Sequence, residues 1–440
     1  MDLDLLKQIS QDVLKLAKNA GATSAEADVS FGIGQSVSVR MGETENIEYN
    51  RDKGVSVTVY FGQQKGNASS SDLSMQALKD TVQAACDIAK FTAKDEFCGL
   101  ADANLMEKEM PDLDLYHPWN IGVDEALEIA MRTEAAALNV DKKRIKNSEG
   151  ASVSASEGVF AYANSHGFVG GYQSSRSSIG CSVIAGENEA MQRDYWHSSA
   201  RDARDLEAPE TIGKIAGERT VRRLGAKAIK TGQYPVLFEA SLASGIISSL
   251  ISAISGGNLY RKSSFLLDSL GTQIGASLLN IEELPHLKKG MASSSFDDEG
   301  VATHARQLVE NGMLNGYVMG SYSARKLGLQ TTGNAGGSHN LIVKHTHKAS
   351  DLLSMMGTGL LVTEVLGHGL NMVTGDYSRG AAGFWVKNGV ITHAVEEITI
   401  ASNMKEMLNQ IVGIGDDAMQ HRSKQVGSIL IEKMTVAASQ

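Results

Sequence analysis

Apolar residues near the start of the chain recur every three or four positions, a spacing that aligns side chains along one face of a helix. They are Leu3, Leu6, Ile9, Val13 and Leu16. The spacing predicts an amphipathic helix over residues 3–20, and residues 73–89 return to the same period. Between these helices the period falls to two, in segments at residues 27–31, 36–41, 46–49 and 55–61. Because Gly, Asp or Asn bounds each segment, we expect antiparallel strands joined by turns.

The same succession of patterns recurs farther along the chain. Residues 124–138 predict a helix, residues 152–163, 168–174 and 178–184 predict strands, and residues 209–224 predict another helix. Helix, strands and helix, twice over, indicate a duplicated α+β unit. We therefore expect an N-terminal α+β domain over residues 1–229, with 1–110 and 111–229 as candidate sub-units.

A turn signal at Lys230-Thr-Gly-Gln-Tyr-Pro235 marks the expected start of a C-terminal domain, residues 230–440. A strand over 236–238 and a helix over 240–254 would open this domain. Later segments are typical of short strands with Gly-rich turns, at residues 312–322, 383–386, 390–395 and 428–432, while 352–368 predicts one of the few helices. Glycine pairs such as Gly32 and Gly34 are expected in turns or close backbone approaches. The predicted fold class is α+β, a duplicated helix/antiparallel-sheet domain followed by a strand-rich α+β domain.

The composition, with 42% hydrophobic and 21% charged residues, is ordinary for a soluble globular chain. Three cysteines (Cys86, Cys98 and Cys181) fit a reducing cytoplasm better than a disulfide framework. The acidic N-terminus lacks the features of a signal peptide, and no apolar run approaches the ~20 residues that span a bilayer. We expect a cytoplasmic protein that has no membrane partner.

The net charge of −10 opposes binding to nucleic acid, because nonspecific affinity for phosphates comes mostly from Lys and Arg. One basic cluster is nevertheless present. It consists of Arg219, Arg222, Arg223, Lys227 and Lys230. We expect this cluster to be a solvated helix face beside a linker rather than a nucleic-acid site.

Thr363-Glu364-x-x-x-His368 has the form of a zinc-protease motif in which threonine replaces the first histidine. A hydrolytic zinc site needs about three protein ligands and an open position for water, and a nearby Glu can act as general base. The neutral hydroxyl of Thr363 is a poor zinc ligand. On an ideal helix, the ends of this motif would also point about 140° apart. The alternative is an ordinary helix end, with Glu364 solvated and His368 next to a Gly stop.

Three other histidines, His339, His345 and His347, lie within nine residues of one another. His345 and His347 would share one face of a strand, and a three-histidine zinc site is chemically sensible. The alternative is a polar surface strand or loop.

The segment that follows the motif places polar groups between glycines, from Gly375 onward. Its candidate substrate- or partner-binding residues are Asp376, Tyr377, Ser378, Arg379, Phe384 and Trp385. Small neighbouring residues let a peptide backbone approach closely, so an extended peptide could add there as a strand. A tight structural turn in the C-terminal core is the alternative.

Several long segments of the chain carry a more specific pattern. They lie at residues 42–48, 112–118, 164–167, 260–271, 321–328, 375–385 and 396–401. Together, and in this order, they resemble the PmbA branch (also called TldE) of the TldD/PmbA family. Members of this bacterial family were once called modulators of DNA gyrase and are now classed as metalloprotease subunits.

The resemblance implies that the catalytic branch, TldD, binds zinc through His-Glu-x-x-x-His and a later Cys. By position, the first His is Thr363, the Glu is Glu364 and the second His is His368. No Cys follows His368 in this chain. The resemblance therefore implies no metal or other cofactor in this chain, no assigned catalytic residue, and zinc in a TldD-type partner.

Three functions follow as hypotheses. The first is a subunit of a heteromeric TldD/TldE-type zinc metalloprotease that cleaves unfolded, extended peptides, as in leader removal from peptide precursors or antitoxin turnover. In that complex the chain would contribute substrate channel and assembly, and in isolation it could form a homodimer. The second is a non-enzymatic interaction protein of a toxin–antitoxin or gyrase-linked pathway. The third is an independent metallopeptidase that uses His368 with the histidines at 339–347.

Overall fold

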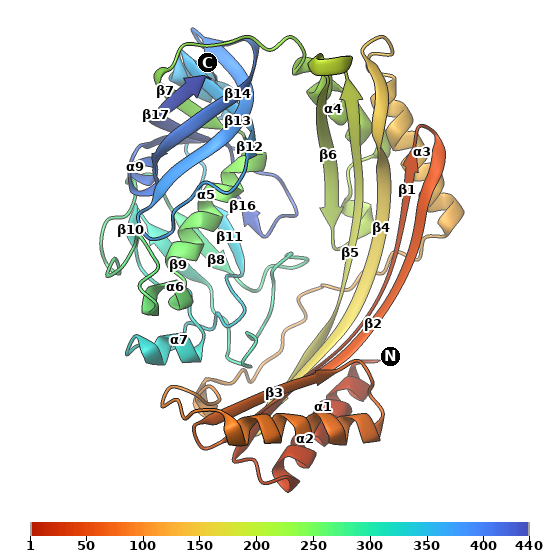
Figure 1. The fold of residues 1–440 in the computed structure, drawn as a ribbon, viewed down its shortest axis with the longest axis vertical. Coiled ribbons are helices and arrows are strands. Elements are labelled where there is room, and N and C mark those ends of the chain that lie inside the picture. The colour runs from red at the N-terminus through yellow and green to blue at the C-terminus, as the bar shows by residue number, and fades with distance from the viewer. Residues whose placement is uncertain (1, 439–440) are drawn as a thin grey trace.

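The N-terminal half of the molecule is built on one long, curved sheet (Figure 1). The computed structural model describes residues 2–438. The sheet has the strand order β3-β2-β1-β4-β5-β6, and every neighbouring pair is antiparallel. The strands are β1 (Ser24–Arg40), β2 (Glu43–Phe61), β3 (Gln64–Ser70), β4 (Ile145–Asn164), β5 (Val169–Ala185) and β6 (Gln192–Ala200).

Each half of this sheet is flanked by two helices. These are α1 (Leu3–Asn19), α2 (Met75–Phe91), α3 (Val123–Leu138) and α4 (Pro209–Arg222), and one-turn helices lie at Ala103–Leu105, Asn188–Ala190 and Ala203–Asp205. The order helix, three strands, helix therefore occurs twice, as the repeated pattern predicts. The two units meet along β1 and β4, where Gly32 lies opposite Gly158.

The sheet has two separate hydrophobic cores, one under each pair of helices. One contains Leu6 and Val13 of α1 with Val57 of β2, and the other contains Ile212 of α4 with Val153 of β4. Along β1, buried positions alternate near both ends but are missing from residues 30–36. The helices thus cover the two ends of the long strands and leave the middle open.

The strands are longer than the sequence pattern predicts. Residues 27–31 and 36–41 are parts of the single strand β1, and Gly32 and Gly34 lie inside it, so the prediction that these glycines form a turn is wrong. Neither glycine has a positive φ, and Gly32 pairs with Asp52 and with Gly158. A Cβ on Gly34 would lie 2.2 Å from the side-chain oxygen of Asn50, so this glycine serves a close approach instead.

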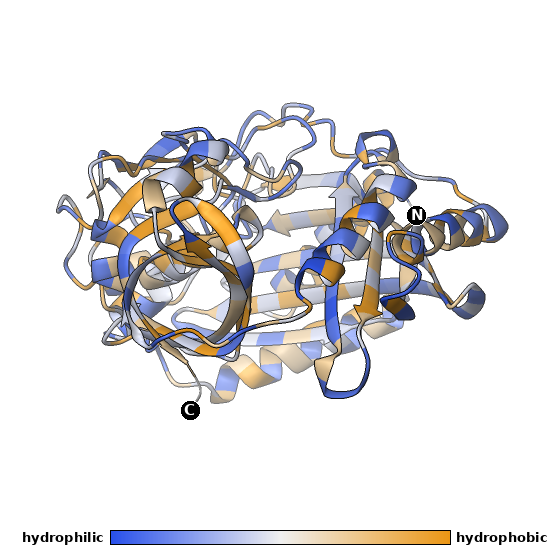
Figure 2. Cartoon of the chain, turned by 90° about the horizontal axis from the view of Figure 1, so that it is seen from above, coloured by the Kyte–Doolittle hydropathy of each residue, from blue (hydrophilic) through white to orange (hydrophobic). Residues whose placement is uncertain are grey.

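The C-terminal half contains a closed barrel, seen end-on in Figure 2. Its strands follow the order β14-β13-β12-β7-β17-β15, and a pairing of β14 with β17 closes the ring. They are β7 (Gly232–Phe238), β12 (Gly359–Leu366), β13 (Asp376–Lys387), β14 (Val390–Asn403), β15 (Ile411–Ile414) and β17 (Ile429–Ala438).

A second, five-stranded sheet and five short helices pack beside the barrel. The strands are β8 (Ile281–Leu284), β9 (Arg306–Glu310), β10 (Met313–Leu314), β11 (Asn340–Val343) and β16 (Lys424–Gln425). The helices are α5 (Ala240–Ala253), α6 (Gly256–Tyr260), α7 (Ser321–Lys326), α8 (Ala349–Met356) and α9 (Met404–Asn409). One large core that includes Phe238, Leu250 and Leu360 joins the barrel to this sheet.

Two predictions for this half are wrong. Residues 352–368 do not form one helix, because α8 ends at Met356 and β12 begins at Gly359. Gly357, at φ 66°, ends the helix, and the β-branched residues Val362, Thr363 and Val365 favour a strand. Residues 312–322 contain only the two-residue strand β10 before Ser321 opens α7.

The two halves are joined by polar contacts as well as by the chain. Lys289 donates to Asp202 at 2.9 Å and to Asp205 at 3.0 Å, and Arg201 donates to the Met291 carbonyl at 2.9 Å. Within residues 2–438, no helix combines the length and the apolar character needed to cross a bilayer.

Candidate functional site

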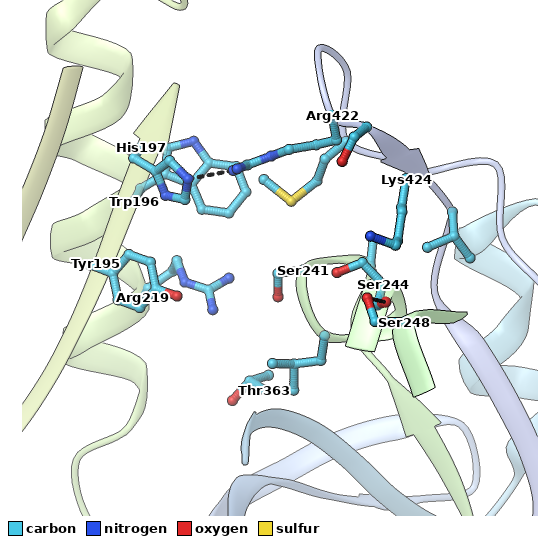
Figure 3. A pocket seen from close by; sticks show the side chains of 15 residues that line it. Tyr195, Trp196, His197, Arg219, Ser241, Ser244, Ser248, Thr363, Arg422 and Lys424 are labelled. Carbon is cyan, nitrogen blue, oxygen red and sulfur yellow. Dashed lines mark hydrogen bonds between the residues drawn. The ribbon is translucent and has the colours of Figure 1, made fainter. Parts of the chain in front are cut away.

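Thr363 lies at a β-bulge of β12. Val362 is opposite Gly383 and Glu364 is opposite Ala382, so Thr363 is left without a partner residue in β13. Bulges re-aim a side chain and are frequent beside functional sites. Only 6% of Thr363 is exposed, and among the described residues its Oγ1 has no hydrogen-bond partner. The residue lines a cavity of about 280 Å³ between the long sheet and the barrel (Figure 3).

The walls of this cavity, here called the Thr363 cavity, come from both halves of the chain. β6 supplies Tyr195, Trp196 and His197, α4 supplies Arg219, the first turns of α5 supply Ser241, Ser244 and Ser248, and the segment around β16 supplies Met419, Arg422 and Lys424. The three serines are spaced by three and four residues, which places their hydroxyls on one face of α5.

The Thr363 cavity is cationic, since Arg219, Arg422 and Lys424 line it and no Asp or Glu does. The Arg422 guanidinium donates to Nε2 of His197 at 2.5 Å. Burial, Arg422 and Arg176 together lower the pKa of His197 to about 4, so the ring is neutral and accepts this bond. Within residues 2–438, neither Arg422 nor Lys424 has a salt-bridge partner.

Arg219 reaches the cavity from an ion-pair network that joins the two halves. Its Nε donates to Asp194 at 3.2 Å and its Nη1 to Glu239 at 2.9 Å. Arg223 binds both Asp194 and Glu364. Arg219 is 9% exposed, so the prediction that this basic cluster is a solvated helix face is wrong for these arginines. Arg219 and Arg223 lie in the interface because they form ion pairs with Glu239 and Glu364 of the C-terminal half.

The residues around Thr363 do not fit a zinc ion. Zinc sites use Cys, His and carboxylate ligands, whereas the Thr363 cavity offers one histidine and three cations. Glu364, at the expected general-base position, is bound to Arg223. The part of the chain from 2 to 438 contains no group of three or more His, Cys, Asp or Glu placed to hold a metal.

His368 lies apart from the Thr363 cavity, exposed in the loop that follows β12. Arg379 donates to the Gly367 carbonyl, and the Ser378 N–H donates to the Gly369 carbonyl at 2.7 Å. The loop that carries His368 is therefore held by β13. The helix-end alternative for this motif is wrong, because the motif spans a strand and a loop.

The six candidate binding residues of β13 do not gather around one cavity. Tyr377 is buried in the core, and Asp376 is exposed and bonded to Thr374 and Asn403. The Phe384 ring lies under the Arg222 guanidinium at 4.8 Å, and Trp385 meets Tyr234 edge-on at 4.8 Å.

Both edges of β13 are already paired. β14 pairs along its whole length, β12 pairs with residues 380–386, and Leu370 bridges Tyr377 on the remaining edge. The prediction that a peptide adds as a strand to residues 375–380 is therefore wrong, because no backbone edge is free there. The other binding roles of these residues stay predictions.

The histidines at 339–347 do not form a site either. His339 is buried, and its N–H and ring bond Glu283 at 2.8 and 3.1 Å. Burial raises the pKa of Glu283, but the bonds from His339 and the charge of Arg306 outweigh it and bring the pKa down to about 2. His345 and His347 follow β11 in a loop, so the prediction that they share a strand face is wrong.

Sequence profiles of PmbA/TldA metallopeptidase domain 1, the central domain and the C-terminal domain match residues 25–89, 116–224 and 231–438. The chain belongs to the PmbA/TldA metallopeptidase family. A Haemophilus influenzae metalloprotease PmbA homolog is 49% identical over 99% of this chain and 96% of its own length. Metalloprotease PmbA of Escherichia coli O157:H7 is 48% identical over 98% and 96%.

The fold is shared with a solved structure. The crystal structure of a candidate modulator of DNA gyrase from Bacteroides thetaiotaomicron superposes with a TM-score of 0.94 and 30% identity. The alignment covers 100% of both chains. The two long-sheet units and the barrel are thus an architecture that this PmbA/TldA chain has in common with that protein.

Sequence reasoning missed most of the cationic wall in this PmbA/TldA chain. Arg422 and His197 are 225 positions apart, and no short motif links them. The one available signal was the spacing of Ser241, Ser244 and Ser248, which predicts a hydroxyl-lined helix face.

Proposed function

We propose that this chain is the non-zinc subunit of a heteromeric metallopeptidase of the TldD/TldE type. A TldD-type partner would bear the zinc, the general-base glutamate and the hydrolytic water. This chain would contribute assembly and part of the surface that holds extended peptides, in processes such as leader removal or antitoxin turnover. The complex would work in the cytoplasm.

One observation carries the proposal. At the position of the first zinc ligand, Thr363 lines a cavity whose charged groups are Arg219, Arg422 and Lys424. A cationic wall repels a divalent metal, and the Glu364 carboxylate is engaged by Arg223 rather than free to activate water. Membership of a metallopeptidase family together with these substitutions favours a role beside a catalytic subunit.

The proposal is tested by reconstitution. The chain and a TldD-type partner from the same source would be purified separately, and cleavage of an unstructured peptide followed by mass spectrometry. Cleavage is expected only on mixing, and it should be lost on treatment with a zinc chelator. A matched variant, Thr363→Ala, should retain cleavage in the mixture, because Thr363 is no metal ligand in this account.

The other hypotheses predict different results. Chelator-sensitive cleavage by the chain alone would establish an independent metallopeptidase and overturn the proposal. Absence of cleavage under every mixing condition would overturn it in favour of a non-enzymatic interaction protein.

A further inference from the structure

Two of the cations that line the Thr363 cavity form no salt bridge within residues 2–438. The chain as a whole has a net charge of −10, yet Arg422 and Lys424 face this space without a salt-bridge partner within residues 2–438. Burial and the nearby Arg176 lower the pKa of Arg422, which records the cost of holding this cation here. Partly buried cations of this kind are stabilised by an anion.

The nearby carboxylates do not fill this role. Asp194 is bonded by Arg219, Glu239 by Arg219 and Arg222, and Glu364 by Arg223. The charge of Glu207 also acts on Arg422, but Glu207 accepts from the Trp196 indole N–H and forms no salt bridge with Arg422. Figure 3 shows the Arg219 guanidinium and the Lys424 ammonium pointing into the space, while Arg422 extends toward His197. His197 accepts from Arg422 as a neutral ring and so positions this guanidinium without cancelling its charge.

The opposite wall of the cavity is formed by Thr363 and the N-terminal turn of α5. Thr363 lines the cavity and is more than nine-tenths buried, but its hydroxyl, which has no partner among the described residues, is closed off from the open space. The N-terminal turn of α5 also borders the cavity through Ser241 and Ser244. A helix N-terminus carries partial positive charge that favours an anion, while the N–H groups of Ala240, Leu242 and Ala243 already donate to Ser428 and Glu239.

The shape and the remaining walls favour a carboxylate attached to a carbon chain. Leu242, Met419, Val426 and the Trp196 ring supply apolar surface beside the cations. The volume of about 280 Å³ is near the lower limit of ordinary ligand pockets, about 300 Å³. It suits one terminal residue of a peptide rather than a long segment or a dinucleotide.

We propose that the Thr363 cavity binds a carboxylate of a peptide substrate, with Arg422 and Lys424 as its charge partners. The carboxylate comes from the peptide's C-terminus or from an acidic side chain. This inference rests on the proposed function, because it takes an extended peptide as the ligand.

The test measures binding to the full chain by calorimetry, using three versions of one unstructured hexapeptide with an apolar last residue. The first has a free C-terminal carboxylate, the second a C-terminal amide, and the third an amide with Glu as the last residue. Inorganic phosphate is titrated separately. The amide without Glu should bind at least tenfold more weakly than a carboxylate-bearing version, and whichever of the other two binds tightly identifies the source of the carboxylate.

Variants assign the effect to the cavity. Lys424→Gln should weaken binding of the carboxylate peptide about tenfold, the loss expected for one charge-assisted bond, and leave the amide peptide unchanged. Lys344→Gln, at an exposed lysine outside the cavity, should have no effect. Because the Lys424 ammonium has no salt-bridge partner among the described residues, its replacement is informative even if Arg422→Gln fails to fold.

Three results would overturn the inference: equal binding of all three peptides, wild-type affinity in Lys424→Gln, or binding of phosphate with no preference among the peptides. The proposed function is judged separately. The reconstituted complex could cleave peptides while Lys424→Gln leaves KM unchanged for both the carboxylate peptide and the amide peptide. In that case the proposed carboxylate site is wrong and the proposed function is supported. If mixing gives no cleavage but binding depends on the carboxylate and Lys424, the function is wrong and the site stands.

Discussion

Glu364 stands where a catalytic general base is expected, yet its carboxylate is bound by Arg223. We predict that Glu364→Gln lowers the free energy of unfolding instead of the rate of peptide cleavage. Removing one partner of a fully buried pair costs about 3–5 kcal/mol, and an exposed pair contributes about 0–1 kcal/mol. The side chains of Arg223 and Glu364 are 12% and 28% exposed, between these limits. We therefore expect a loss of about 2 kcal/mol.

The assay is urea unfolding of the full chain, followed by circular dichroism. A double-mutant cycle with Arg223→Met should give a coupling energy of about 1–2 kcal/mol, because the two side chains are in contact. The control is Glu218→Gln, which breaks the exposed pair of Lys214 and Glu218 at 3.8 Å. That change should cost less than about 0.5 kcal/mol.

Peptide cleavage by the reconstituted complex distinguishes a structural role of Glu364 from a catalytic one. With enough protein folded at the assay temperature, Glu364→Gln should retain the wild-type kcat. A variant of unchanged stability that loses cleavage would refute the reasoning, because Glu364 would then act on the substrate and not on Arg223.

Two further predictions concern the packing of the site. The pKa of His197 falls from 6.5 to about 4 in the folded chain, so the unfolded chain takes up the proton first on acidification. Its contribution to stability is intact above pH 6.5 and is lost as the pH falls toward 4, by about 1–2 kcal/mol at pH 5. Urea unfolding at pH 7 and pH 5 should therefore show a smaller loss of unfolding free energy in His197→Gln than in the wild type. An equal loss in the two proteins would contradict the assignment. Gly383→Ala would place a Cβ 1.9 Å from the Leu361 carbonyl oxygen and should destabilise the barrel by about 3 kcal/mol, whereas Gly245→Ala, in open space on α5, should stabilise it by up to about 1 kcal/mol. Thermal unfolding measures both, and equal effects would argue against the close packing of β12 on β13.

The helices of the N-terminal half were predictable because their apolar positions repeat over several turns. The predicted segment 124–138 agrees with α3 to within one residue, and 209–224 agrees with α4 to within two. The sequence pattern wrongly divided strand β1 at Gly32 and Gly34, because glycine usually indicates a turn. In the structure, backbone pairing on both sides holds these glycines extended. The extended conformation at these glycines depends on pairing with β2 and β4, which a local sequence pattern does not reveal.

The candidate site was only partly predictable. Thr363 and Glu364 stood out in a motif, but the motif's expected helix is a strand, because tertiary pairing with β7 and β13 decides the conformation of a short apolar run. Arg422, Lys424 and His197 belong to separate elements that meet only after both halves have folded. The charge of the Thr363 cavity is therefore a property of the fold and not of any local segment.

The most direct test of the central claim is the zinc content of the purified, untagged chain, measured by mass spectrometry of the metal after dialysis against trace zinc. We expect less than about 0.1 zinc per chain, because a three-ligand site should fill and hold the metal whereas a cationic wall should not. Near one zinc per chain would contradict it and restore an independent metal site.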